Sequence, residues 1–256
     1  MNWAKHRRRK AAAKCHMRLD LQSFLPKFAV VKPAKHSDPA VAYEVCSGLK
    51  AGEIVVFDKA YIDFVHLNLL DERSVFWVSR AKDNMQYKTV KENKTSGKIL
   101  RDEIIQLTTP KTFSQYTKNL RLVEASVEID GKEMQMTFIT NNLNWAASSI
   151  CELYKCRWAV EVFFKQIKQN LQLCDFLGYS ENAIKWQVWT ALLVYVLLRF
   201  FAFTNKWEHS FSRFITMLRA VLWDKFNVSE LIKAYGTAGG LKRTRAAPEQ
   251  AYLPGF

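Results

Sequence analysis

The sequence lacks several motifs that would assign it to common classes. Its five cysteines form no CxxC pair and its five histidines form no HExxH motif. An odd number of unpaired cysteines argues against a disulfide framework or a structural zinc site and is typical of a reducing cytoplasm. Repeats and low-complexity tracts are also absent. The first residues are followed by charges rather than by an apolar run, so we expect no secretory leader.

Acidic residues are few compared with basic ones. Lys and Arg number 38 against 24 Asp and Glu, which gives a net charge of +14. Such an excess favours a phosphate backbone over acidic or neutral small molecules as the partner. The charge gathers near both ends, at Lys5, Arg7, Arg8, Arg9, Lys10, Lys14 and Arg18 and at Lys242, Arg243 and Arg245. We interpret these clusters as phosphate contacts; disordered basic tails are the alternative.

A stripe of charged residues is the strongest indication of a functional site. Tyr154, Arg157, Glu161 and Lys168 are spaced by three, four and seven residues, and Lys165 lies between the last two. A helix that turns about 100° per residue would place all of them on one face. One carboxylate surrounded by cations suits a site that holds a metal together with a polyanion. The alternative is a solvated face with favourable pairs four residues apart.

A second acid lies about a hundred residues upstream. Residues 54–57 form a short apolar run that predicts a buried strand, and Asp58 follows it directly. The carboxyl end of a central strand is where open α/β sheets bind ligands, so Asp58 could meet a glutamate from a helix packed on the sheet. Two such acids collect divalent cations for phosphoryl transfer. Asp63 is a rival, but we expect it to be the N-cap of the helix that follows.

The remaining patterns predict a mixed α/β chain with one large domain or one domain with an insertion. Strands are expected twice within 11–33, broken at Gln22–Ser23, and at 74–79, 87–90, 103–107, 120–128 and 133–140, with a hairpin at 129–132. Helices are expected at 40–46, starting from Ser37-Asp38-Pro39, and at 64–70, 205–222 and 228–234. The predicted parts are an α/β portion at 1–82, a β-rich insertion at 83–145, a helical portion at 146–235 and a basic tail at 236–256.

One segment, 186–203, is almost wholly apolar and nearly long enough to span a bilayer. Gln187 and Arg199 interrupt it, and the chain before it has the pattern of a soluble α/β protein. We therefore expect a buried helix packed behind a catalytic sheet, and no membrane association.

The stripe and the aspartate strand together resemble a known family. Tyr154, Arg157, Glu161 and Lys168, with Phe57-Asp58-Lys59-Ala60-Tyr61, look like the signature of bacterial DDE transposases of the insertion-sequence-four type. The segment from Asn2-Trp3-Ala4-Lys5 to Ala13-Lys14-Cys15-His16 is similar to the family's stretch before its second sheet strand, and Thr140-Asn141-Asn142-Leu143 resembles the lead-in to its glutamate helix. The resemblance extends to about residue 200.

This resemblance implies a ribonuclease-H-like, retroviral-integrase-like core with a β-rich insertion and a helical C-terminal part. It implies cut-and-paste transposition of an insertion sequence by cleavage and strand transfer with two Mg²⁺ or Mn²⁺ ions. Asp58 and Glu161 would be the second and third catalytic acids and would bind the metal. The residues expected to contact DNA are Tyr154, Arg157, Lys168, Lys165, Lys59 and Lys14.

The resemblance also sets expectations for partners and location. The partners would be transposon ends and target DNA, bound by a homodimer in the bacterial cytoplasm, at the nucleoid when on DNA. The β-rich insertion would contact DNA around the cut end through Lys88, Lys91, Lys94, Lys98 and Arg101. A solvated sheet edge guarded by lysines explains these residues equally well.

One family feature is missing from the sequence. The family's first aspartate precedes the segment that resembles residues 2–16, so we expect the 1–82 part to lack its first strand and the chain to be truncated. Asp20 is the nearest substitute, but it falls after the matching segment. His16 resembles a family position and is expected to be a core or supporting histidine. The alternative function is a catalytically inactive DNA-binding fragment that occupies transposon ends or inhibits a full-length partner.

Overall fold

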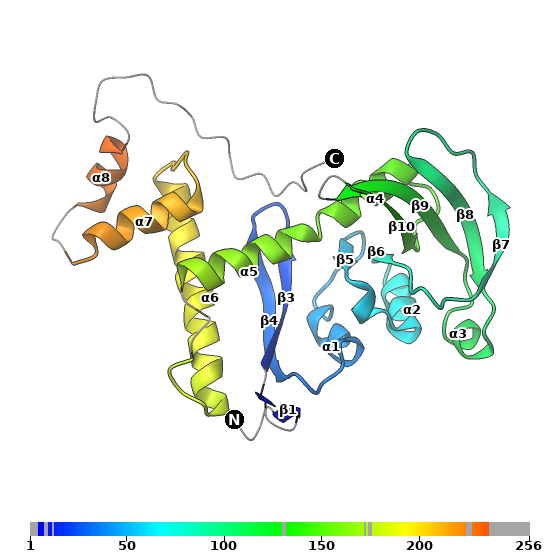
Figure 1. The fold of residues 1–256 in the computed structure, drawn as a ribbon, viewed down its shortest axis with the longest axis horizontal. Coiled ribbons are helices and arrows are strands. Elements are labelled where there is room, and N and C mark those ends of the chain that lie inside the picture. Colours follow the sequence, from blue (N-terminus) through cyan, green and yellow to red (C-terminus); the bar gives the residue numbers. More distant parts are fainter. Residues whose placement is uncertain are drawn as a thin grey trace.

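The computed structural model describes residues 5–7, 10–11, 13–129, 132–171, 173, 176–223 and 227–235 (Figure 1). Its strands are β1 Lys5–Arg7, β2 Lys10–Ala11, β3 Ala13–Asp20, β4 Leu25–Pro33, β5 Ile54–Phe57, β6 Phe76–Arg80, β7 Tyr87–Glu92, β8 Ile99–Leu107, β9 Leu120–Ile129 and β10 Lys132–Thr140. Its helices are α1 Asp38–Val45, the 3-10 turn η2 Lys59–Tyr61, α2 Phe64–Glu72, α3 Pro110–Gln115, α4 Ala147–Lys155, α5 Trp158–Asn170, α6 Glu181–Thr204, α7 Phe211–Val221 and α8 Val228–Ala234. The chain is therefore of mixed α/β class, as predicted.

A six-stranded mixed sheet forms one half of the molecule, in the order β5-β6-β10-β9-β8-β7. β5 and β6 are parallel, and the other neighbours are antiparallel. Alternate residues of β6 face opposite sides, since Trp77 packs with α2 residues such as Leu67, whereas Val78 packs with Ile150 of α4. The sheet is thus covered by α2 and α3 on one face and by α4 on the other. The strands of the predicted β-rich stretch continue the same sheet as β5 and β6.

A hairpin and the C-terminal helices form the other half. β3 and β4 pair antiparallel as a separate two-stranded sheet, which confirms the paired strands expected within 11–33. Ala29 and Val31 of β4 share a core with α5, α6, α7 and α8. α5 leaves the six-stranded sheet beside α4 and reaches this second core, so it connects the two halves (Figure 1).

Several predicted elements need correction. The segment around Tyr154 and Glu161 is not one helix, because α4 ends at Lys155 and α5 starts at Trp158. The helix predicted from 205 begins only at Phe211, with Ser210 as its N-cap. β8 starts at Ile99, four residues before its predicted start. The predicted hairpin strands do pair, with Lys132 opposite Ile129, while the turn at 130–131 lies outside the described residues.

β5 is also different from the expected buried, central strand. It has the predicted bounds, but it is an edge strand of the six-stranded sheet as described, and the side chain of Ile54 is 43% exposed. The other three residues of β5 are half-buried. The apolar residues of β5 are only partly covered. Val55 and Phe57 pack on one face of the sheet with Trp77 of β6, and Val56 packs on the other face with α4.

α6 is not the fully buried helix that its composition suggested. It is the one described helix long and apolar enough to cross a membrane, but only 22% of its most apolar window is buried, and such a single helix is weak evidence for a span. One face, with Ile184, Val188 and Tyr195, packs in the second core. The opposite face is exposed over much of its length.

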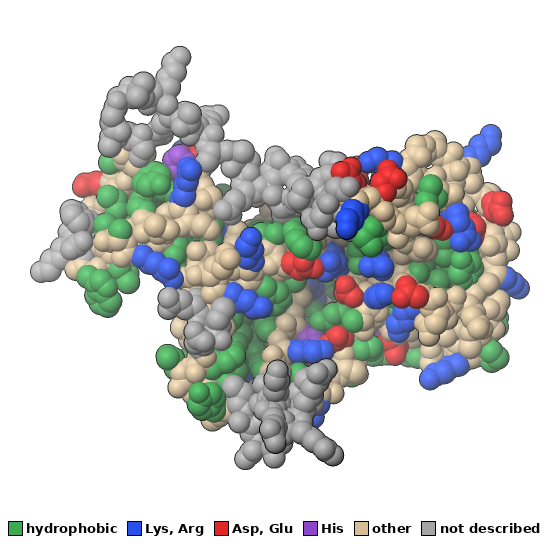
Figure 2. Space-filling model, in the orientation of Figure 1, with side chains coloured by type: hydrophobic (Ala, Val, Ile, Leu, Met, Phe, Trp, Pro, Cys, Tyr) green, Lys and Arg blue, Asp and Glu red, His purple; other side chains and the backbone are tan. Residues whose placement is uncertain are grey.

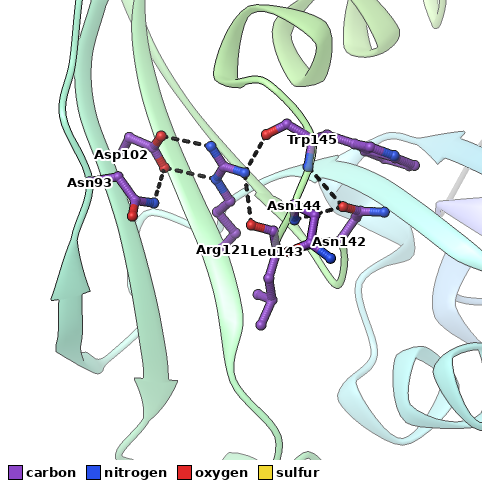
Figure 3. Close-up of polar contacts among 7 residues, drawn as sticks. All are labelled: Asn93, Asp102, Arg121, Asn142, Leu143, Asn144 and Trp145. Carbon is purple, nitrogen blue, oxygen red and sulfur yellow. Dashed lines mark hydrogen bonds and ion pairs between the residues drawn. The ribbon is translucent and has the colours of Figure 1, made fainter.

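A buried ion pair links the strands to the loop before α4 (Figure 3). Nε and Nη2 of Arg121 on β9 donate to both carboxylate oxygens of Asp102 on β8, at 2.8 and 2.7 Å. The remaining nitrogen, Nη1, donates to the carbonyl oxygens of Leu143 and Trp145. Within the same loop, Asn142 Oδ1 accepts the N–H groups of Asn144 and Trp145. The pair therefore fixes where α4 starts relative to the sheet.

This pair lowers the pKa of Asp102. Burial works to raise it, but hydrogen bonds from Arg121 and Asn93 outweigh burial, and the pKa is lowered from its ordinary value. A carboxyl whose pKa is lower in the folded than in the unfolded state adds stability at higher pH. That contribution is present above the ordinary Asp value and is lost as the pH falls through the lower, folded-state pKa.

We predict that Arg121→Met lowers the free energy of unfolding by about 3–5 kcal/mol, because it leaves a buried carboxylate without its main partner. Urea unfolding followed by far-UV circular dichroism measures the loss. The control is Lys185→Met, which removes a lysine whose side chain is 39% exposed from its pair with Glu181, itself 46% exposed, and its cost should stay near or below about 1 kcal/mol. Equal losses in both variants would show that burial of the Arg121 pair does not matter.

Candidate functional site

Asp58 lies at the end of the sheet where the parallel strands β5 and β6 terminate. It follows β5 and caps η2, with Oδ1 accepting the N–H of Ala60 at 3.1 Å. Its other oxygen, Oδ2, faces Arg157 at 3.9 Å, and its side chain is 46% exposed. One oxygen therefore fixes the carboxylate to the backbone while the other is directed toward the start of α5.

The turn between α4 and α5 brings the charged residues of the motif to Asp58. The N–H of Arg157 donates to the carbonyl of Tyr154, and that of Ala159 donates to the carbonyl of Cys156, which closes a tight turn between the helices. Tyr154 is 7% exposed, and its ring is tilted against that of Phe138, with the ring centres 4.9 Å apart. It belongs to the core under α4 rather than to an exposed stripe. The predicted single face is thus wrong in detail, although the residues remain neighbours.

Arg157 joins the two predicted acids. Its Nη1 lies 2.7 Å from Glu161 Oε1 and 3.9 Å from Asp58 Oδ2. Its guanidinium carbon is also 5.7 Å from the centre of the Tyr154 ring. Two carboxylates that are far apart in the sequence therefore converge on one nitrogen atom.

Electrostatics at this cluster follow from its partial burial. Burial alone would lower the pKa of Arg157, but the hydrogen bond and charge of Glu161, together with Asp58, raise it above its ordinary value. Burial raises the pKa of Tyr154, against the opposing effect of the Arg157 charge. At neutral pH the guanidinium is therefore charged and the phenol is neutral, with its hydroxyl able to donate.

The predicted lysines lie in two kinds of surroundings. Lys165 and Lys168 are exposed on α5, one and two turns beyond the exposed Glu161. Lys59 pairs with Asp83 at 3.0 Å, and Lys14 pairs with Asp38 at 2.8 Å. Figure 2 shows acidic and basic side chains interleaved near the middle of this face, where α5 meets the sheet in Figure 1. Only the α5 lysines extend the row begun by Arg157 and Glu161.

The rival residues have structural roles. Asp63 is the N-cap of α2, as predicted, accepting the N–H of His66 at 3.0 Å. Asp20 accepts the N–H groups of Gln22 and Ser23 in the β3–β4 turn, which gives it a turn-stabilising role. His16 is buried, and its Nδ1 is 2.7 Å from the hydroxyl of Tyr61, next to η2.

The sequence interpretation missed Arg80. Ser79 of β6 pairs with Phe57 of β5, so the next residues along these parallel strands, Arg80 and Asp58, end at the same edge of the sheet. The charge of Arg80 also acts on the pKa of Tyr154. A basic residue directly at the end of a predicted strand was the available signal. The basic N-terminal residues 8–9 and the cluster at 242–245 lie outside the described residues.

A metal ion would find two carboxylate ligands here. Within the described part of the chain, no group of three or more His, Cys, Asp or Glu side chains is close enough to hold one. Asp58 and Glu161 do provide hard oxygen donors, the ligand type that Mg²⁺ and Mn²⁺ prefer. The donor chemistry therefore fits a divalent cation, and further ligands would have to come from solvent, DNA or residues not described here.

Sequence comparison identifies the family to which the chain belongs. The family described as transposase DDE domain matches residues 2–197. A Sinorhizobium fredii protein named as a transposase, y4zB, is 27% identical over 97% of this chain and 70% of its own length. A Geobacillus stearothermophilus protein named as a transposase for insertion sequence element IS5377 is 30% identical over 85% of this chain and 57% of its own.

A third relative is also named as a transposase of an insertion sequence element. The Bacillus thuringiensis transposase for insertion sequence element IS231E is 23% identical over 73% of this chain and 49% of its own length. The chain thus spans 70% of the first relative and about half of the other two. Because the family match includes both Asp58 and the α4–α5 turn, the chain belongs to the transposase DDE domain family, among transposases of the insertion-sequence-four type.

Proposed function

We propose that this chain carries two of the catalytic acids of a DNA transposase that moves an insertion sequence by a cut-and-paste reaction. The observation that carries the proposal is the convergence of Asp58 and Glu161 on one nitrogen of Arg157. The parallel β5–β6 pair, the antiparallel β10 beside it and a glutamate helix next to the strand end support a ribonuclease-H-like core.

In this proposal Asp58 and Glu161 hold Mg²⁺ or Mn²⁺. The chemistry such an ion supplies is activation of the attacking oxygen and stabilisation of the leaving oxygen in phosphoryl transfer. The hydrogen bond from Ala60 orients the Asp58 carboxylate and leaves Oδ2 available. Glu161 is held by Arg157, whose Nη1 also lies 3.9 Å from Asp58 Oδ2.

The cations of the site would position DNA. Arg157 has further donor nitrogens besides Nη1 and can bind a phosphate at the scissile bond. Tyr154, which is neutral at pH 7, can orient a phosphate through its hydroxyl. Lys165 and Lys168 continue along α5, and Lys59 and Lys14 are weaker candidates because both hold acidic partners. Arg80, at the same strand end as Asp58, is a further candidate.

A phosphate and the two acids would compete for Arg157. In the DNA-free chain the guanidinium lies close to both carboxylates and offsets part of their mutual repulsion. A phosphate that draws Arg157 away exposes the acids to a cation. DNA and metal would therefore bind with positive coupling, because each removes a competitor of the other.

The wider assignments follow from the same proposal. The partners are transposon ends and target DNA, with two copies in the DNA complex, in the bacterial cytoplasm. The β-rich part at 83–145 would contact DNA through its exposed lysines, such as Lys88 and Lys91.

A second function has its own support. The described residues bring only two acids together, and Arg157 occupies the space between them. With these two acids alone, the chain would bind DNA without cutting it, and would occupy transposon ends or inhibit a full-length partner.

We predict that the logarithm of the association constant for duplex DNA falls linearly with the logarithm of the salt concentration. The slope should be about −0.9 for each phosphate neutralised. Fluorescence anisotropy titrations measure this slope. Arg157→Gln should make it shallower by about 1, because one phosphate contact is lost. The control, Lys50→Gln, changes an exposed residue before the amino end of β5, whereas Asp58 follows the carboxyl end, and its slope should equal that of the unmodified chain. An unchanged slope in Arg157→Gln would remove this residue from the interface.

We predict that Mn²⁺ binds weakly to the chain and that this binding needs both Asp58 and Glu161. Asp58→Asn and Glu161→Gln should weaken binding at least about tenfold, and Arg157→Gln should strengthen it, because the competing cation is gone. Electron paramagnetic resonance of free Mn²⁺ measures each affinity. Asp83→Asn, which changes an exposed carboxylate paired with Lys59, is the control and should bind like the unmodified chain. Weaker binding in Arg157→Gln would contradict the competition.

We predict that the 256-residue chain binds DNA but does not nick it in Mg²⁺, because two acids place the nucleophile and the leaving oxygen poorly. A supercoiled-plasmid nicking assay measures this. Robust nicking that Asp58→Ala and Glu161→Ala leave unaffected would refute the catalytic assignment. Robust nicking that both changes abolish would instead support the active enzyme over the inactive fragment.

A further inference from the structure

The outer face of α6 carries a row of large apolar side chains that no described part of the chain covers. Their exposed fractions range from 49% for Trp189 to 82% for Phe203. The row consists of Trp186, Trp189, Leu193, Leu197, Phe200 and Phe203. Apolar patches of this size on a soluble chain usually mark an interaction site.

The spacing of the row is that of a helix that packs against another helix. Trp186, Leu193 and Phe200 repeat every seven residues. Trp189 and Phe203 follow three positions later, and at the level between them Leu197 is exposed while Val196 packs against the second core. The exposed residues are therefore spaced three or four positions apart and form a narrow apolar seam along α6.

The seam also carries no charge. The only ionised side chain between Trp186 and Thr204 is Arg199. Its Nε donates to the Tyr195 hydroxyl at 2.8 Å, and its guanidinium carbon lies 4.3 Å from the centre of the Phe211 ring, inside the second core. Covering the seam therefore requires no desolvation of an ion.

The position of α6 argues against lipid as the occupant. Its inner face is held against β4, α5 and α7, so a bilayer could reach only one side of the helix. Figure 1 shows α6 in the half of the molecule away from β7 and β8. The seam is thus accessible to a partner of similar length and shape.

The exposed area matches that of a stable dimer. Four aromatic and two leucine side chains at these exposures offer on the order of 700–800 Å² of apolar surface, close to the ~800 Å² that each partner buries in a standard interface. A second copy of α6 supplies the same length, spacing and lack of charge.

We propose that α6 packs antiparallel against α6 of a second copy, around a two-fold axis midway between Trp186 and Phe203, the two ends of the seam. A two-fold contact uses the same patch on both copies. The antiparallel direction aligns the helix dipoles favourably. This interface requires no DNA, so its failure would leave the proposed function untouched.

Sedimentation equilibrium of the full chain without DNA tests the interface. The expected mass is twice 29.7 kDa. Leu193→Glu combined with Leu197→Glu should weaken the dimer about 30-fold or more, the loss typical of central interface residues. The control Leu69→Glu makes the same change at an exposed leucine of α2, 41% exposed, and should leave the dimer intact. A monomeric unmodified chain, or a dimer that survives the double change in a variant with unaltered circular dichroism, overturns the proposal.

Cysteine crosslinking tests the direction and serves if the double variant fails to fold. In a chain with Cys156→Ser and Cys174→Ser, Leu193→Cys should form a covalent dimer on mild oxidation, because the two copies of this residue lie close to the axis. Trp186→Cys should not, because an antiparallel pair separates its two copies by about 17 residues of helix, or roughly 25 Å. Equal crosslinking of both variants would mean a parallel pair, and crosslinking of neither would mean no α6 contact; either result overturns the proposal.

Discussion

The buried ion pair between Arg121 and Asp102 determines where the candidate site lies. It joins β9 to β8, and through the carbonyls of Leu143 and Trp145 it fixes the loop that leads into α4. α4 then packs on the sheet, and a tight turn sets the direction of α5. Because each step is short and hydrogen-bonded, the position of the glutamate on α5 depends on a pair of residues in the middle of the sheet.

Arg157 has a comparable role within the site. The turn between the helices places it between Asp58 and Glu161, which would repel each other at close range without a cation. The guanidinium is therefore both a stabilising partner of the acids and a possible ligand of phosphate. In a chain with a net charge of +14, this cluster is a point where two acids share one arginine.

Local signals predicted the regular elements well. The bounds of β5 and α8 agree with the apolar runs, and the N-cap role of Asp63 follows from its place before the α2 pattern. The break between α4 and α5 gave no such signal, because Cys156 and Arg157 include neither glycine nor proline and both tolerate a helix. The predicted single stripe failed for this reason, and Tyr154 became a core residue.

By itself, the sequence determined the family, the pairing of an aspartate at a strand end with a glutamate on a helix, and the basic character of the surface. These follow from residue types and local spacing, which survive any arrangement of the elements. Only the tertiary structure decided that β5 lies at an edge, that Arg157 lies between the acids and that α6 leaves one apolar face uncovered. Each of these depends on which distant segments pack together, and an apolar residue has the same identity whether its neighbour is the core, another copy or water.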